Sequence, residues 1–184
     1  MRALWAAAQR ALRGKRRRVS VARFALELEP RLSQLHEQLV AGRWRPSSAT
    51  PMAIADPKPR IIHVPTVGDR VVHQALGAVL EPRFERRLIR DTYASRRGLG
   101  THAAFRRARA YRWHAPLDVA RYSPSIDHAV LEAEVWRDVP EPWLREVLST
   151  MLAGHVRPGV HPFPGDDLFE PARRRIGLPL GTYV

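Results

Sequence analysis

The sequence predicts an α+β fold, a helical chain with a few short strands. Apolar residues recur at helical spacing along much of the chain. Two short apolar stretches, residues 52–56 and 60–64, flank Pro57-Lys58-Pro59 as the arms of a hairpin would. Strands do not alternate regularly with helices, which favours α+β.

Residues 1–45 are predicted to form a basic helical extension. Helices are expected at 2–13, 20–29 and 30–41, and the last two are hinged at Pro30, because proline suits a first helical turn. An apolar stripe at helical spacing should be buried. Its members are Val21, Phe24, Leu28, Leu32, Leu35 and Leu39.

Residues 46–112 form the second predicted segment, which begins with the hairpin. A helix is then expected after Thr66, which caps it, with Asp69 in the position that completes a capping box. We expect His73 on the polar face of this helix and a hydrogen-bonded or surface role for it. Another helix is expected from 101 to about 112, after two glycines that break the chain.

Residues 113–184 form the third predicted segment. A strand is expected at 114–119, followed by a turn and by helices at 128–137 and 141–153. The Pro- and Gly-rich stretch that comes next predicts a loop or hairpin. The five tryptophans are scattered, so core or helix-end positions are expected for them.

The charge of the chain predicts a polyanionic partner. Its 31 basic and 18 acidic residues give a formal net charge of +13. Residues 83–112 hold ten arginines against only Glu85 and Asp91. The run Arg16-Arg17-Arg18 is by itself more typical of a solvated segment than of nucleic-acid contact.

Composition also excludes several classes of site. The chain has no cysteine, so disulfides and cysteine-based zinc sites are excluded. No apolar run approaches the roughly 20 residues of a membrane span. We therefore expect no membrane association and a cytoplasmic location.

Asp118 is the first candidate for chemistry, because it follows an apolar segment and precedes a turn. A carboxylate at such a strand end can hold a hard cation such as Mg²⁺. For a single aspartate, a helix cap or an ion pair is the commoner role.

Four segments resemble the first four motifs of bacterial-type reverse transcriptases, in the order of that family. The segments are PKPRIIHVPTVGDRVVHQAL at 57–76, DTYASRRGLGTHAAFRR at 91–107, LDVARYSPSIDH at 117–128 and IGLPLG at 176–181. One such segment would be a weak signal, but four in order are a specific one. Within the family, the chain looks most like enzymes of diversity-generating retroelements, with retron and group II intron enzymes as alternatives.

The resemblance implies the fingers and part of the palm of a right-hand polymerase, with 46–112 fingers-like and 113–184 an incomplete palm. It implies RNA-directed DNA polymerase activity by a two-Mg²⁺ mechanism, with an RNA template and a DNA or other primer as partners. The family's Tyr-x-Asp-Asp hairpin and thumb would follow the fourth motif. We therefore expect a truncated chain that is inactive alone, or one that relies on a separate chain for the rest of the palm and thumb.

The third and first motifs imply the catalytic residues. Asp118 would be catalytic and would ligate metal through its carboxylate, and Val119 would ligate metal through its backbone carbonyl. Lys58 and Arg60 would bind the triphosphate of the incoming nucleotide, where cations offset developing charge.

The second and third motifs imply contacts to the template and the sugar. Arg96 and Arg97 would lie near the template strand. Ser123 occupies the place where the family has an aromatic residue beneath the sugar, so either Tyr122 substitutes for that residue or sugar discrimination is altered. Asp127 is expected to cap the next helix rather than to bind metal.

Other interpretations stay open at this point. A basic RNA-binding module that lacks catalysis is the main alternative, and a nonfunctional remnant is another. Gly165-Asp166-Asp167 resembles a polymerase aspartate pair, but the surrounding prolines disfavour a strand hairpin, so a solvated loop is expected.

Overall fold

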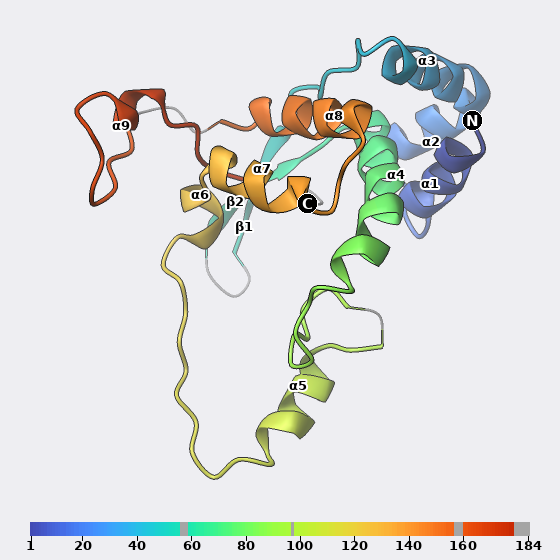
Figure 1. Ribbon diagram of the computed structural model, residues 1–184. Helices are drawn as coiled ribbons and strands as arrows, with labels where there is room; N and C mark the ends of the chain where they lie inside the picture. Colours follow the sequence, from blue (N-terminus) through green and yellow to red (C-terminus); the bar gives the residue numbers. More distant parts are fainter. Residues whose placement is uncertain (56–58, 97, 157–159, 179–184) are drawn as a thin grey trace. The chain divides into compact units, whose positions relative to one another are not determined.

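The computed structural model describes residues 1–55, 59–96, 98–156 and 160–178 (Figure 1). It divides into two compact units: unit 1 comprises Met1–Ala78 and Arg121–Val184, and unit 2 comprises Val79–Ala120. The described elements in chain order are α1 (Arg2–Leu12), α2 (Val19–Leu26), α3 (Leu28–Val40), β1 (Thr50–Ile54), β2 (Arg60–Val64), α4 (Val67–Phe84), α5 (Thr101–Ala108), α6 (Tyr122–Ser125), α7 (His128–Trp136), α8 (Pro142–Ala153) and α9 (Glu170–Arg173). This division does not test the three segments predicted from the sequence, so those segments stay a prediction.

The core of unit 1 lies where α1, α2 and α3 gather around the first half of α4 (Figure 1). The predicted stripe is confirmed: Val21, Phe24 and Leu32 are buried, and its other three leucines pack against them half-buried. The break between α2 and α3 falls at Glu27, and Pro30 lies within the first turn of α3. The hinge therefore comes three residues earlier than predicted.

The predicted hairpin and the cap of the next helix are both confirmed. β1 and β2 pair antiparallel, with Met52 opposite Ile62. Thr66 Oγ1 accepts from the backbone N–H of Asp69 at 3.2 Å, and the Asp69 carboxylate accepts from the Thr66 hydroxyl at 2.6 Å. This reciprocal pair satisfies a free donor at the start of α4.

Helix α4 contains Pro82 and ends at Phe84, and residues 85–90 after it lie outside helix and strand. Proline has no N–H, so the carbonyl of Ala78 lacks its usual helical partner. Ala78 is also the last residue of the first part of unit 1. Helix α5 ends at Ala108, one turn before its predicted end.

The strand predicted at 114–119 is wrong. These residues form an irregular segment in which every residue is exposed, and Leu117 is 94% exposed. A strand requires a neighbour to complete its hydrogen bonds. In the described residues β1 and β2 pair with each other, and the 114–119 segment has no such neighbour.

Helices α7 and α8 confirm the two predicted helices and pack together. Asp127 caps α7, as expected: its Oδ1 accepts from the N–H of Ala129 at 2.8 Å. Arg145 of α8 donates to the carbonyls of Val139 at 2.6 Å and Trp136 at 2.9 Å, which fixes the connection between the two helices. In the part of the chain that is described, no helix is long and apolar enough to cross a membrane.

Candidate nucleic-acid interface

The two acidic residues among 83–112 are both engaged by arginines within unit 2. Arg96 pairs with Glu85, and Arg107 pairs with Asp91. Hydrogen bonds from Arg107 and then Tyr93 lower the pKa of Asp91, so this carboxylate stays ionised when the pair forms. These pairs engage both carboxylates of the region, which has ten arginines in all.

Arg96 has a mainly internal role in the structure. Its guanidinium donates to Glu85 Oε1 at 2.5 and 2.8 Å and to the carbonyls of Ile89 and Thr92 at 3.1 and 3.2 Å. Its side chain is only 14% exposed. Arg96 thus fixes the turn between α4 and α5, and its predicted template contact stays a prediction.

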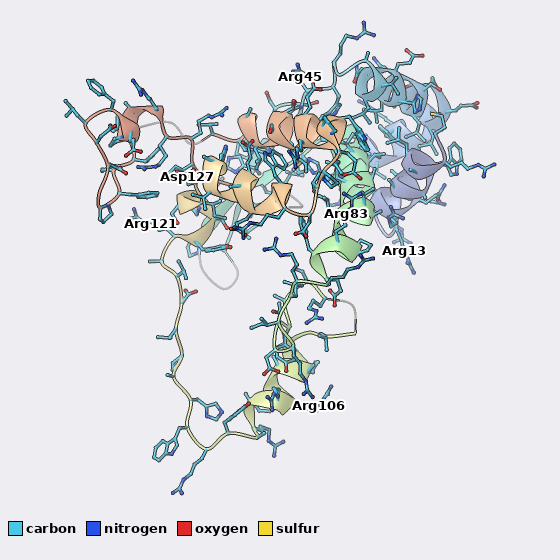
Figure 2. All side chains as sticks on the ribbon, viewed as in Figure 1. Arg13, Arg45, Arg83, Arg106, Arg121 and Asp127 are labelled. Carbon is cyan, nitrogen blue, oxygen red and sulfur yellow. The ribbon has the colours of Figure 1, made fainter. Side chains whose placement is uncertain are left out.

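Other arginines of unit 2 are exposed and have no ion pair with a carboxylate among the described residues. They include Arg86, Arg106, Arg109 and Arg112. Arg106 lies on α5 (Figure 2). A group of guanidinium ions without counterions is the feature that phosphate-binding surfaces share.

Three exposed aromatic rings lie among these arginines, each with a guanidinium over its face. Arg109 lies 6.0 Å from the ring centre of Phe105, Arg107 lies 5.0 Å from that of Tyr111, and Arg112 lies 5.6 Å from that of Trp113. The rings are 64%, 51% and 83% exposed. Exposed rings interleaved with cations provide stacking surfaces for bases beside phosphate contacts.

This aromatic group was missed in the sequence, where Trp113 was assigned to a core or helix-end position. Trp113 is exposed and lies five residues beyond the last residue of α5, so this assignment is wrong. Arg109 follows Phe105 by four residues, and Tyr111 follows Arg107 by four. That spacing places each arginine and its ring on the same face of a helical turn, and it is the signal that could have revealed the group.

In unit 1, the segments that resemble the third and fourth motifs are hydrogen-bonded to each other. The N–H of Leu178 donates to the Ser123 carbonyl, and the N–H of Gly177 donates to the Ile126 carbonyl, both at 2.8 Å. The buried His128 Nε2 donates to the Gly177 carbonyl at 2.8 Å. Residues about 50 positions apart in sequence therefore form one local structure.

Arg174 joins the same structure from the other side. Its Nε donates to Asp127 Oδ2 at 3.0 Å, and its Nη atoms pair with both oxygens of Asp166. The Arg174 guanidinium lowers the pKa of Asp166 to about 2. Asp166 and Asp167 lie outside helix and strand, so the loop expected for Gly165-Asp166-Asp167 is confirmed, but the Asp166 side chain is only 10% exposed and is paired rather than solvated. Figure 2 labels Asp127, which Arg174 contacts, and Arg121, which is the first residue of the second part of unit 1.

The other predicted site residues lie in several places. Asp118 and Val119 are exposed in the irregular segment of unit 2, whereas Tyr122 and Ser123 open α6 in unit 1. Tyr122 is exposed and Ser123 half-buried. Lys58 and Arg97 lie outside the described residues. Arg60 lies opposite Ile54 in the register of the hairpin, and the structure does not describe the side chain of Arg60.

The donor atoms of Asp118 and Val119 fit Mg²⁺ in kind. A carboxylate and a backbone carbonyl are hard oxygen donors, which Mg²⁺ prefers. No hydrogen bond or ion pair to another described residue occupies the Asp118 carboxylate. Over the described ranges, no three His, Asp or Glu side chains are close enough together to form a metal site. The pair would thus supply part of a coordination sphere.

His73 is buried, which corrects its assignment to a polar helix face. It is 3% exposed, and neither ring nitrogen has a hydrogen-bond partner in the described structure. Burial lowers its pKa, Asp69 opposes that shift, and His155 adds to it. Burial also lowers the pKa of His155, with further lowering by His63 and His128. The helix face that carries His73 is therefore an internal one.

Comparisons with known proteins show a similarity over much of the chain. No protein-family model matches the chain. The chain is 26% identical over 151 residues to Protein YkfC of Escherichia coli (strain K12). That match covers 76% of this chain and 39% of YkfC, so the chain spans well under half the length of this relative.

Proposed function

We propose that this chain is part of a bacterial-type RNA-directed DNA polymerase, a cytoplasmic protein with the fingers and part of the palm of the family. The observation that carries the proposal is the hydrogen bonding between Ser123–His128 and Ile176–Leu178. These two segments resemble separate motifs of one family, and their contact is what a common functional site requires. The exposed arginines of unit 2 support an RNA template as the partner.

In this proposal, unit 2 binds the template through phosphate contacts and base stacking. Arg106, Arg109 and Arg112 neutralise backbone phosphates, and the rings of Phe105 and Trp113 stack with bases. Arg96 and Arg107 hold the surface in shape through their internal pairs. Arg97 is a further proposed template contact.

The proposed chemistry depends on residues of the first and third motifs. Asp118 and Val119 would hold Mg²⁺, which when bound activates a primer hydroxyl and stabilises the departing pyrophosphate. Lys58 and Arg60 hold the nucleotide triphosphate by charge. Tyr122 and Ser123 lie at the position that contacts the sugar in the family, so they set the preference for deoxynucleotides.

The test joins this chain to the downstream part of a related polymerase that carries Tyr-x-Asp-Asp and a thumb. Extension of a DNA primer on an RNA template is then measured with Mg²⁺. Asp118→Asn keeps the size of the side chain but removes its charge, so we expect activity to fall at least about 100-fold while folding is retained. Asp127→Asn is the matched control, because asparagine also caps helices. Activity that survives Asp118→Asn and is abolished by Asp127→Asn would contradict the assignment.

A non-catalytic RNA-binding module is the second candidate. The observation that favours it is the group of exposed rings and guanidinium ions around α5, which needs no metal to bind RNA. Salt-sensitive RNA binding by this chain, together with no extension by the joined protein, would support this candidate over the first.

A further inference from the structure

A second basic group lies in unit 1, away from the arginines of unit 2 in sequence. It begins with the turn between α1 and α2, where the N–H of Arg18 donates to the Lys15 carbonyl at 3.0 Å. A hydrogen bond of this kind brings the first and last residues of the turn within about 7 Å of each other. Gly14 precedes the turn with a φ of +70°, a conformation that suits glycine and ends α1. Lys15 and Arg18 are both exposed.

The packing of unit 1 places this turn beside the first turns of α4. Leu12 and Val21, which lie on either side of the turn, share one core cluster with Val71 of α4. Arg10 of α1 also donates to the carbonyl of Gln74 in α4 at 3.1 Å. Because Gln74 lies one helical turn after Arg70, the end of α1 runs along the face of α4 that carries Arg70.

Arg70 completes the group, and its environment lacks a counterion. Its side chain is partly buried, and its Nε is enclosed without a hydrogen-bond partner in the described structure. The adjacent Asp69 makes no ion pair with it in the described structure, and Asp69 Oδ2 instead accepts from the Thr66 hydroxyl and from the N–H of Ser47. An enclosed donor without an acceptor is costly to a fold.

The three cations also repel one another. The pKa of Lys15 is lowered by burial, then by Arg70 and by Arg18. The pKa of Arg70 is lowered by burial and then by Arg18. Among the described residues, none of the three has an ion pair or a side-chain hydrogen bond to relieve this repulsion. The first turn of α2 adds to the positive potential, since it contains no acidic residue and no side-chain cap.

We propose that Lys15, Arg18 and Arg70 together hold a phosphate group of a bound nucleic-acid strand. A phosphate group would accept hydrogen bonds from these side chains and offset the charge of all three. That this phosphate belongs to a nucleic-acid strand, and not to a small molecule, rests on the proposed function. The same chemistry would suit free phosphate, so the experiment separates the two sources.

The first measurement is thermal unfolding of the whole chain at low ionic strength, with inorganic phosphate or with sodium chloride at matched ionic strength. Phosphate should raise the Tm of the wild-type chain and of Arg23→Gln, a charge-matched control at an exposed position of α2. It should not raise the Tm of Arg70→Gln or of Arg18→Gln. Without phosphate, Arg70→Gln should be at least as stable as wild type, because a source of repulsion is removed.

The second measurement is the affinity for a single-stranded RNA oligonucleotide at several salt concentrations. Arg23→Gln measures how much the slope of log affinity against log salt changes when a charge far from the site is removed. Arg70→Gln should flatten this slope by about 0.7 more than Arg23→Gln does, because one phosphate contact is lost as well. Equal slopes for Arg70→Gln and Arg23→Gln would show that the ligand is not a nucleic-acid strand. A rise in Tm with phosphate that persists in Arg70→Gln and Arg18→Gln would show that these residues do not form the phosphate site.

The outcomes also separate this inference from the proposed function. If Arg106 and Arg109 variants weaken RNA binding but Arg70 and Arg18 variants do not, the inference fails and the function stands. If the wild-type chain binds no RNA, the function and the strand both fail, and a phosphate-dependent Tm then identifies free phosphate as the ligand. A lower Tm of Arg70→Gln without phosphate, together with an unchanged phosphate response, would identify a purely structural arginine.

Discussion

Asp127 uses its two carboxylate oxygens for two different purposes. Oδ1 accepts from the first N–H groups of α7, and Oδ2 accepts from Arg174 at 3.0 Å. Both contacts involve the same side chain, so one substitution removes the helix cap and releases the segment that carries Arg174. A metal ligand would need these oxygens free, which agrees with the capping role.

Replacement of Asp127 by alanine should therefore destabilise the chain more than replacement by asparagine. Loss of the cap alone should lower the free energy of unfolding by about 0.5–2 kcal/mol, and loss of the Arg174 partner adds to this. Asparagine keeps the cap and loses only the charge. Urea unfolding of Asp127→Ala and Asp127→Asn measures the difference, and equal destabilisation would show that the cap contributes little.

His73 should make the chain sensitive to acid. Its pKa in the folded chain is lowered below the usual 6.5, so the unfolded chain takes up the proton first as the pH falls. Stability is thus intact above about pH 6.5 and declines as the pH drops toward the folded pKa, by at most about 1.4 kcal/mol per pH unit for one proton. His155, which lies near His73, also has a pKa lowered by burial and shares in this response.

The measurement is urea unfolding of the wild-type chain and His73→Gln between pH 7.5 and 5. The variant should lose less stability over this range than the wild type does. His102→Gln, an exposed change on α5, is the control and should follow the wild type. Identical pH profiles for all three proteins would mean that His73 takes up its proton equally in both states.

At the scale of elements, α5 and the residues after it form the surface most suited to RNA. Arg106→Ala with Arg109→Ala should flatten the slope of log affinity against log salt by up to about 1.4, since each phosphate contact on a single strand contributes about 0.7. Arg96→Ala should instead lower the stability of unit 2 and leave the slope nearly unchanged, because its donors are used internally. Fluorescence anisotropy with a labelled RNA at four salt concentrations measures the slopes. A large change of slope in Arg96→Ala would indicate that Arg96 contacts the template directly.

The elements that were predicted correctly depend on local signals. The Thr66–Asp69 cap and the Asp127 cap each involve residues two or three positions apart, and the sequence marks the hairpin by two short apolar stretches on either side of Pro57-Lys58-Pro59. Two of the errors involve distant partners. A strand at 114–119 needed a neighbour that sequence cannot supply, and the burial of His73 depends on packing across unit 1.

The candidate site divides in the same way. The four motif segments can be found from the sequence, and so can the excess of arginine at 83–112. The engagement of Arg96 by Glu85 could not be predicted, because these residues are 11 positions apart and meet only through the turn. The Arg70 environment could not be predicted either, since it depends on how α1 packs on α4.

For the whole molecule, the division into units predicts where proteases act first. The described residues 109–121 lie outside helix and strand and are exposed throughout. Trypsin should therefore cut first after Arg109 and Arg112, while Arg70 and Arg145, which lie in helices, resist longer. Mass spectrometry of a brief digest identifies the first cuts. Bound RNA should slow them if this region is the interface, and cleavage at an unchanged rate in saturating RNA would place the interface elsewhere.

The Arg174 contacts also affect the order in which unit 1 assembles. Helices α7 and α8 are neighbours in sequence, but Arg174 meets Asp127 across 47 residues and Gly177 meets His128 across 49. Closing so long a loop carries an entropic cost that local contacts do not, so the α7–α8 hairpin should form early and the segment 160–178 should join it late. On unfolding, the segment 160–178 should therefore separate before the α7–α8 hairpin does. Amide hydrogen exchange in this segment should be faster than in the α7–α8 hairpin, because local release is possible while the helices stay folded.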